Sequence, residues 1–89
     1  MGEMAEHQKA MVEGMHKMHP AMMQAMMAKD PDVSFVCGMI VHHMGAISMS
    51  EVELKYGDDQ QAKAMAEKII DAQKKEIEEM TIWVNEHAK

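Results

Sequence analysis

Residues 30–59, DPDVSFVCGMIVHHMGAISMSEVELKYGDD, carry the signals that decide the fold. Asp30 suits the N-cap of a helix because its carboxylate can accept hydrogen bonds from the first free backbone N–H groups. Pro31 suits the first helical position, where a backbone N–H would have no partner inside the helix. The stretch therefore predicts a helix from Pro31 to about Tyr56.

A further helix is expected directly after this stretch. Gly57 is placed to end the preceding helix in a left-handed cap, and Asp58 or Asp59 can cap the next one. We expect this next helix to span Asp59 to His87. Its inner stripe is predicted from helical spacing and consists of Ala62, Ala66, Ile69, Ile70, Gln73, Ile77, Met80 and Val84.

Residues 1–28 predict a first helix, from about Glu3 to Ala28. Its apolar positions recur at steps of three, four and seven, as one face of a helix requires, and they are Met4, Met11, Met15, Met18, Met22 and Met26. Pro20 lies inside this segment, where it removes one backbone hydrogen bond and clashes with the preceding turn. We therefore expect a kink or a break near His19.

The three segments define the fold class. The 89 residues make a single domain, and no segment has a strand pattern. Short connections between long amphipathic helices favour antiparallel neighbours, so the predicted fold is all-α, an antiparallel bundle of three helices per chain. A chain this short buries a modest core, and three helices leave a groove that a second copy can fill. We expect self-association into a homo-oligomer.

The composition narrows the classes of partner. The net charge is −6 and no basic run interrupts it, so nucleic acid is not an expected partner. No membrane span is expected, because no apolar run approaches the ~20 residues that a spanning helix needs. Cys37 is the single cysteine, which excludes an internal disulfide. Fourteen residues are methionine, a flexible residue that specifies packing poorly, so core packing alone accounts badly for this composition.

The candidate metal ligands concentrate in GMIVHHMGAISM, residues 38–49. Met39 lies one helical turn before His42 and His43, so a thioether and an imidazole can converge. The two histidines point roughly 100° apart, and one helix does not easily aim both at one metal. The pair indicates either a metal at a seam with a neighbouring helix, or two sites that use one histidine each. Met49 continues the face of His42.

The last predicted helix offers partners for this site. Met80 lies on its inner stripe as a further thioether, and we expect the amide of Gln73 to orient a metal-bound imidazole. Gly38 and Gly45 each cost about 1 kcal/mol against alanine inside a helix. The close approach of another backbone would account for them.

Residues 1–28 repeat the chemistry with less order. Imidazoles and thioethers stand there at chelating i,i+4 spacing, and the candidates are His7, Met11, Met15, His16, His19 and Met23. We expect auxiliary sites of low denticity in this segment.

The types of donor atom indicate which metal ions the site would prefer. Thioether is a soft, neutral donor that suits Cu(I) or Ag(I) and does little for zinc, magnesium or calcium, whereas imidazole accepts many ions. The expected function is binding of these monovalent ions for sequestration, buffering or transfer, and transfer would require a metal-exchange partner protein. We expect no enzymatic activity.

Two motifs, DPDVSFVCGMIVHHMGAISM and AEKIIDAQKKEIEEMTIWV, resemble the family catalogued as domain of unknown function number 305. Its members are small bacterial secreted proteins with ferritin-like helical bundles, some associated with copper handling. The resemblance covers about residues 30–87 and leaves the first helix as specific to this protein. It implies a ferritin-like bundle, a periplasmic or secreted location and, since two-repeat members are longer, self-association. The metal-binding positions that it implies are Met39, His42, His43, Met49 and Met80.

Plain core packing competes with metal binding as an explanation of the methionines. Taken one at a time, Met39, Met49, Met65 and Met80 fit either interpretation. The methionines would also suit an adaptable groove for an amphipathic partner, which would make the protein an interaction module. Such a groove does not require two histidines beside Met39.

An enzyme with a di-iron or di-manganese carboxylate site is a third interpretation. That chemistry requires two Glu-x-x-His motifs and two further glutamates that point inward. The chain has one such motif, from Glu13 to His16, so association would have to complete the site.

Overall fold

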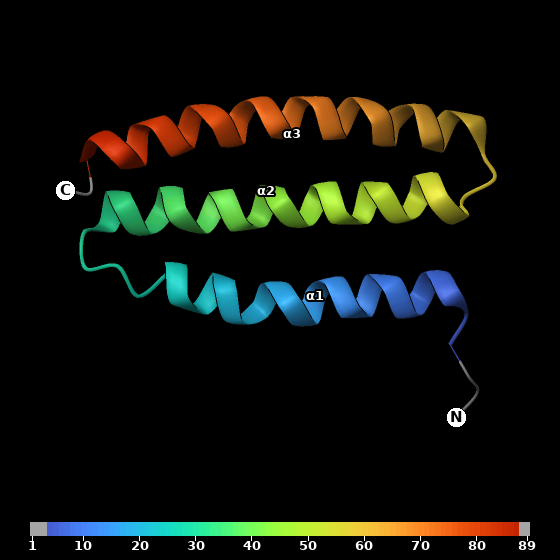
Figure 1. Ribbon diagram of the computed structural model, residues 1–89, viewed down its shortest axis with the longest axis horizontal. Helices are drawn as coiled ribbons and strands as arrows, with labels where there is room; N and C mark the ends of the chain where they lie inside the picture. The colour runs from blue at the N-terminus through green and yellow to red at the C-terminus, as the bar shows by residue number, and fades with distance from the viewer. Residues whose placement is uncertain (1–3, 88–89) are drawn as a thin grey trace.

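The computed structural model describes residues 4–87 of the chain, which form three helices, α1 (Glu6–Ala25), α2 (Pro31–Tyr56) and α3 (Gln60–His87). None of these described residues lies in a strand. The prediction of an all-helical chain with three helices is therefore confirmed. Successive helices run in opposite directions and are joined by short links (Figure 1).

The start of α2 follows from its capping residues. The Asp30 side chain accepts hydrogen bonds from the backbone N–H of Asp32 at 2.8 Å and from that of Val33 at 3.2 Å. Pro31 occupies the first helical position. These contacts satisfy backbone donors that the helix itself leaves free, and the predicted bounds of α2 are confirmed.

The link between α2 and α3 differs from the prediction at Gly57. This residue has φ −75° and ψ 157°, which is extended backbone and not the left-handed cap that we expected. The extended conformation carries the chain directly from α2 to Asp59, whose side chain accepts a hydrogen bond from the backbone N–H of Ala62 at 2.8 Å. Asp59 is therefore the cap of α3, one of the two predicted alternatives.

The first helix is shorter than predicted. Met1–Glu3 lie outside the described residues, so the expected start at Glu3 falls there, and α1 begins at Glu6. The backbone N–H of Ala5 donates to Gln8 Oε1 at 2.8 Å, which closes the first turn. At the other end the helix stops at Ala25, three residues before the expected end.

Pro20 does not break α1. The helix continues through it to Ala25, so the predicted break near His19 is wrong. The helix contacts α2 on both sides of the proline. Met18 lies against Gly45 of α2, and Met22 lies against Gly38.

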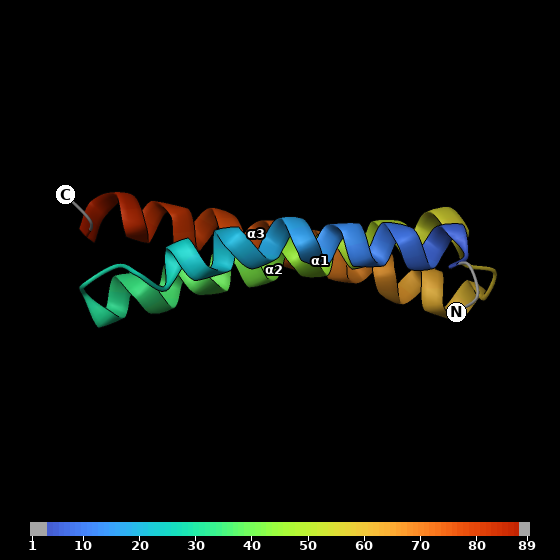
Figure 2. The ribbon, with the colours of Figure 1, turned by 90° about the horizontal axis from the view of Figure 1, so that it is seen from below.

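The three helices form one layer. The backbone of α2 lies beside those of α1 and α3, while the backbones of α1 and α3 do not approach each other over the described residues. The structure measures 45 × 32 × 13 Å along its principal axes, so its smallest extent is well under half of either other extent (Figures 1 and 2). As a result, α2 has a neighbour on each side and two broad open faces.

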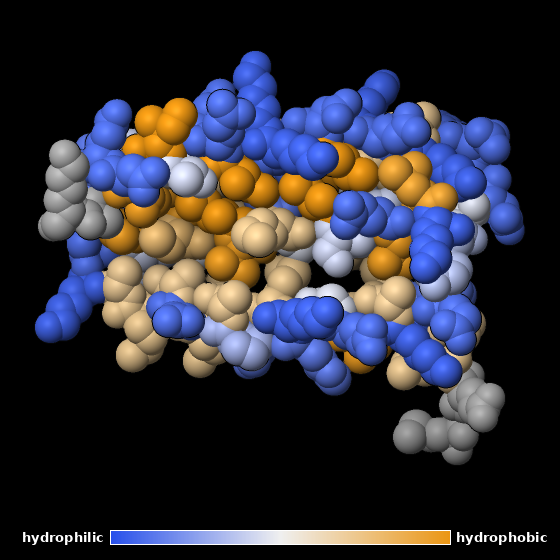
Figure 3. All heavy atoms as spheres, viewed as in Figure 1, coloured by the Kyte–Doolittle hydropathy of each residue, from blue (hydrophilic) through white to orange (hydrophobic). Residues whose placement is uncertain are grey.

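This arrangement gives a small core. Ala66, which is 4% exposed, is the one buried hydrophobic residue within the described range. Most of the predicted inner stripe of α3 is half-buried, but Ile69 is 41% exposed, contrary to the prediction, because it points toward an open face of the layer. In Figure 3 apolar residues gather over α2 and its border with α3, and the border with α1 is hollowed.

By length and composition α2 could cross a membrane. A buried core helix of a soluble protein and a signal sequence pass the same test, and 22% of the apolar window of α2 is buried here. The absence of a membrane span stays a prediction.

Candidate metal centre

A cavity of about 260 Å³ lies between α1 and α2, with the imidazole of His42 on its wall. Its lining combines this one histidine with four thioethers and four small residues, namely Met11, Met15, Met18, Met49, Gly14, Gly45, Ala46 and Ser48. Soft sulfur donors and one nitrogen donor therefore meet in a single hollow.

Helical spacing brings these donors together. His42 and Met49 are seven residues apart, so they project from one stripe of α2. Met11, Met15 and Met18 follow each other at steps of four and three, which places them on one stripe of α1. The two stripes face the same cavity because α1 packs directly against α2.

Glycines on both helices make room for the thioethers. Gly45 is buried, and a methyl group there would collide with the Met18 thioether. At Gly38 a methyl carbon would lie 3.8 Å from the sulfur of Met22, which is ordinary contact. We expected both glycines to admit another backbone, and that is wrong, because the atoms nearest to them are methionine side chains of α1.

His43 points to the other neighbour of α2. It is 8% exposed, and its Nε2 lies 3.2 Å from Oε1 of Glu76 on α3. Its Nδ1 is buried with no hydrogen-bond partner. The expectation that Gln73 orients this imidazole is wrong, since Glu76, one turn further along α3, takes that place.

The predicted set of five ligands is therefore divided. His42 and Met49 share the cavity with α1, whereas His43 lies in the seam with α3. Met39 and Met80 are half-buried, and neither lines the cavity of His42. The structure therefore places the two histidines at different seams of α2, which is compatible with either arrangement that the sequence left open.

The structure adds one residue to the candidate ligands. Met18 lines the cavity, although the sequence placed it on the apolar stripe of the first helix without a role in metal binding. Met11 and Met15 were expected as auxiliary ligands and instead lie beside His42. Two features of the sequence could have indicated this position of Met18, namely the methionine stripe of the first helix and a glycine, Gly45, in the next helix.

A second hollow, of about 290 Å³, follows α1 toward its C-terminal end. Its lining consists of Met15, His16, Met18, His19 and Met22. His16 and His19 are exposed, and Met23, which was predicted to pair with His19, is 51% exposed and does not line this hollow. Glu13 is exposed as well, so the single Glu-x-x-His motif lies on the surface.

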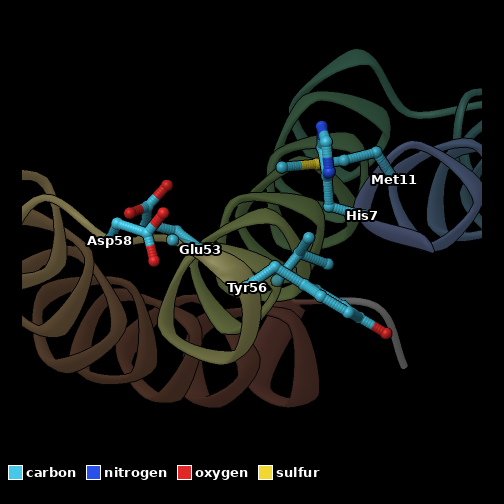
Figure 4. A pocket seen from close by; sticks show the side chains of 7 residues that line it. His7, Met11, Glu53, Tyr56 and Asp58 are labelled. Atoms are coloured by element: carbon cyan, nitrogen blue, oxygen red, sulfur yellow. The ribbon is translucent and has the colours of Figure 1, made fainter. Parts of the chain in front are cut away.

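His7 and Met11 line a third hollow, of about 220 Å³, near the link between α2 and α3. Figure 4 shows both side chains extending from α1, with Glu53, Tyr56 and Asp58 around the same space. The i,i+4 spacing of His7 and Met11 thus places an imidazole and a thioether in one hollow, as the sequence predicted. Over residues 4–87, no three histidine, cysteine, aspartate or glutamate side chains gather closely enough to hold a metal by themselves.

Trp83 and His87 form a separate pair at the end of α3. Their rings stack with centroids 4.1 Å apart and an interplanar angle of 13°. The Nδ1 atom of His87 lies 2.8 Å from the carbonyl oxygen of Trp83. His87 therefore packs on Trp83 and does not line the cavity of His42. Cys37 is a half-buried free thiol.

A comparison with protein families matches residues 1–84 to the model described as a domain of unknown function, DUF305. The chain belongs to this family. The match includes all of α1, so the expectation that the first helix is specific to this protein is wrong. The DUF305 description assigns no function. No curated protein matches the chain.

Proposed function

We propose that this protein binds the monovalent soft ions Cu(I) and Ag(I) and serves to sequester, buffer or transfer them in metal resistance. The observation that supports this proposal is the cavity whose lining combines His42 with Met11, Met15, Met18 and Met49. A set of donors that consists mainly of thioethers favours soft monovalent ions over zinc, magnesium or calcium.

The small residues of the cavity support the same proposal. Gly14, Gly45 and Ala46 leave an apolar space in which flexible methionine side chains can rearrange around an ion. The site needs no proton loss at sulfur, so the imidazole is the single donor whose protonation competes with the metal.

The proposal extends to the assembly and the compartment. We propose that the open layer is completed by self-association into a ferritin-like antiparallel bundle, that the protein acts in the periplasm or outside the cell, and that it is not an enzyme. The wide open faces of α2 and the small core support the self-association.

A titration with Cu(I) and with Ag(I) under anaerobic conditions, read by native mass spectrometry, tests the binding. We expect one tightly bound ion per chain, weaker additional ions, and much weaker binding of Zn(II). The double variant His42→Ala/His43→Ala should lose the tight site and keep its helical circular dichroism. Unchanged affinity for Ag(I) in that variant would refute the proposal.

A further inference from the structure

The single chain exposes more surface than a folded monomer of its size. Its accessible surface is 6833 Å² for a mass of 10.1 kDa, whereas a compact monomer of that mass exposes about 5,300 Å². Its radius of gyration is 15.1 Å, against about 12 Å for a compact chain of 89 residues. The excess of about 1,500 Å² follows from the one-layer arrangement.

Much of the exposed apolar surface lies on one side of the layer, which we call the methionine face. It is formed by side chains of all three helices, namely Met15, Phe35, His42, Met49, Met65 and Ile69. On α2, Phe35, His42 and Met49 follow each other at steps of seven and share one stripe. Met44 is nine residues from Phe35, which turns it to the opposite side of the helix.

Two hollows make the methionine face continuous. Met11, Ala46 and Met49 line both the cavity of His42 and a wider hollow of about 360 Å³. This wider hollow reaches across α2 to Met65 and Ile69 of α3. The face is therefore one groove that crosses the three helices, with flexible thioethers along its rim.

The excess exposed area of the chain is consistent with a second copy of the chain bound to the methionine face. If each of two copies covered its excess of about 1,500 Å², the interface would total about 3,000 Å², within the range of obligate homodimers. A two-fold interface places the same patch on both partners, so projecting side chains of one copy can enter the hollows of the other. Met15 and Met65 project in this way, with 67% and 53% of their surface exposed.

We propose that the methionine face is the interface between two copies of this chain and that it encloses the metal site of His42. The second half of this inference rests on the proposed function. Met15 and Met49 line that site and are 67% and 54% exposed, so a partner on this face covers them and shields a bound ion from water. Binding at a site that the dimer completes stabilises the dimer by the same factor by which dimerisation tightens binding.

Analytical ultracentrifugation of the wild type and of point variants, with and without one equivalent of Ag(I), tests the inference. Met65→Glu places a charge in the interface and should raise the dimer dissociation constant about a hundredfold. Ile82→Glu is its matched control, because Ile82 lies on the same helix with the same exposed fraction of 53% and lines none of the hollows described above. Met44→Glu tests the opposite face, and both controls should change the constant less than about threefold.

His42→Ala separates the metal from the interface. Alanine keeps a small apolar side chain in the methionine face, so the metal-free dimer constant of this variant should lie within about threefold of the wild type. Ag(I) should tighten the wild-type dimer at least about tenfold and leave the dimer of this variant unchanged. Ile69→Glu repeats the interface test if Met65→Glu loses its helical circular dichroism.

Each contrary outcome is distinct. A monomer at every concentration, or a dimer broken by Met44→Glu and not by Met65→Glu or Ile69→Glu, overturns the interface. Tight Ag(I) binding to such a monomer would leave the proposed function standing. A dimer that Met65→Glu breaks but that bound Ag(I) does not tighten overturns the shared site. A failure of Ag(I) to bind at all would refute the proposed function. The effect of Met65→Glu on the dimer dissociation constant would still show whether the methionine face is the interface.

Discussion

The imidazole rings of His42 and His43 lie 6.1 Å apart between centroids at an interplanar angle of 63°, and they face different helices. His42 lines the cavity shared with α1, and His43 meets Glu76 of α3. Two adjacent histidines in this sequence therefore belong to two seams. This division leads to different expectations for their single variants.

His42→Ala should weaken Ag(I) binding about 10- to 100-fold, because it removes the imidazole from the cavity. The variant should lose little stability, because His42 is exposed and its removal leaves no described hydrogen-bond partner unsatisfied. His43→Ala should instead cost about 1–3 kcal/mol of stability through its lost packing, with less than about a threefold effect on affinity. Isothermal titration and urea unfolding of both variants measure the two effects. Equal losses of affinity would show that both imidazoles bind one ion.

Gly45→Ala should lower the affinity for Ag(I) about tenfold, because a methyl group there displaces the Met18 thioether from the cavity. Gly38→Ala is the matched control on the same helix, where the new methyl meets Met22 at ordinary contact distance. It should raise stability by about 1 kcal/mol through helix propensity and leave affinity unchanged. An unchanged affinity in both variants would exclude Met18 from the site.

Pro20→Ala should stabilise the protein by about 1–3 kcal/mol. The helix continues through Pro20, so alanine restores a backbone hydrogen bond and removes a steric clash without changing the path of the chain. Chemical denaturation followed by circular dichroism gives the difference. A loss of stability would mean that the Pro20 ring itself contributes to the packing of α1 on α2.

Asp59→Ala should destabilise the protein by about 1 kcal/mol, because it removes the side-chain acceptor for the backbone N–H of Ala62 at the start of α3. Asp58→Ala is the control, since Asp58 is an exposed neighbour that does not cap the helix. Thermal unfolding midpoints of the two variants should differ by several degrees. Similar midpoints would show that the cap contributes little to the fold.

Local signals in the sequence were sufficient for most of the secondary structure. Asp30 and Pro31 fix the start of α2 through contacts within a few residues, and the structure has them as predicted. The end at Gly57 was predicted less well, because the short link to Asp59 decides its backbone conformation and a left-handed cap is one of several ways to end a helix.

The sequence predicted histidine and methionine side chains for the candidate site but did not predict which helix lies beside His42. The periodicity of α2 shows that His42 and His43 face different ways, but it does not show which helix lies on which side. The sequence favoured Met39 and Met80 as partners, and the order of helices in the layer placed Met11, Met15 and Met18 of α1 there instead. Such contacts between helices depend on packing, which no local pattern contains.

The central claim is that a soft ion binds between α1 and α2, and methyl-resolved NMR of the methionines tests it most directly. Protein labelled with ¹³C at the methionine methyl groups is titrated with Ag(I) without oxygen, and each resonance is assigned by substitution. We predict that one equivalent shifts the methyl signals of Met15, Met18 and Met49 and leaves that of Met44 unchanged. Shifts confined to Met39 and Met80, with the cavity methionines unmoved, would contradict the account.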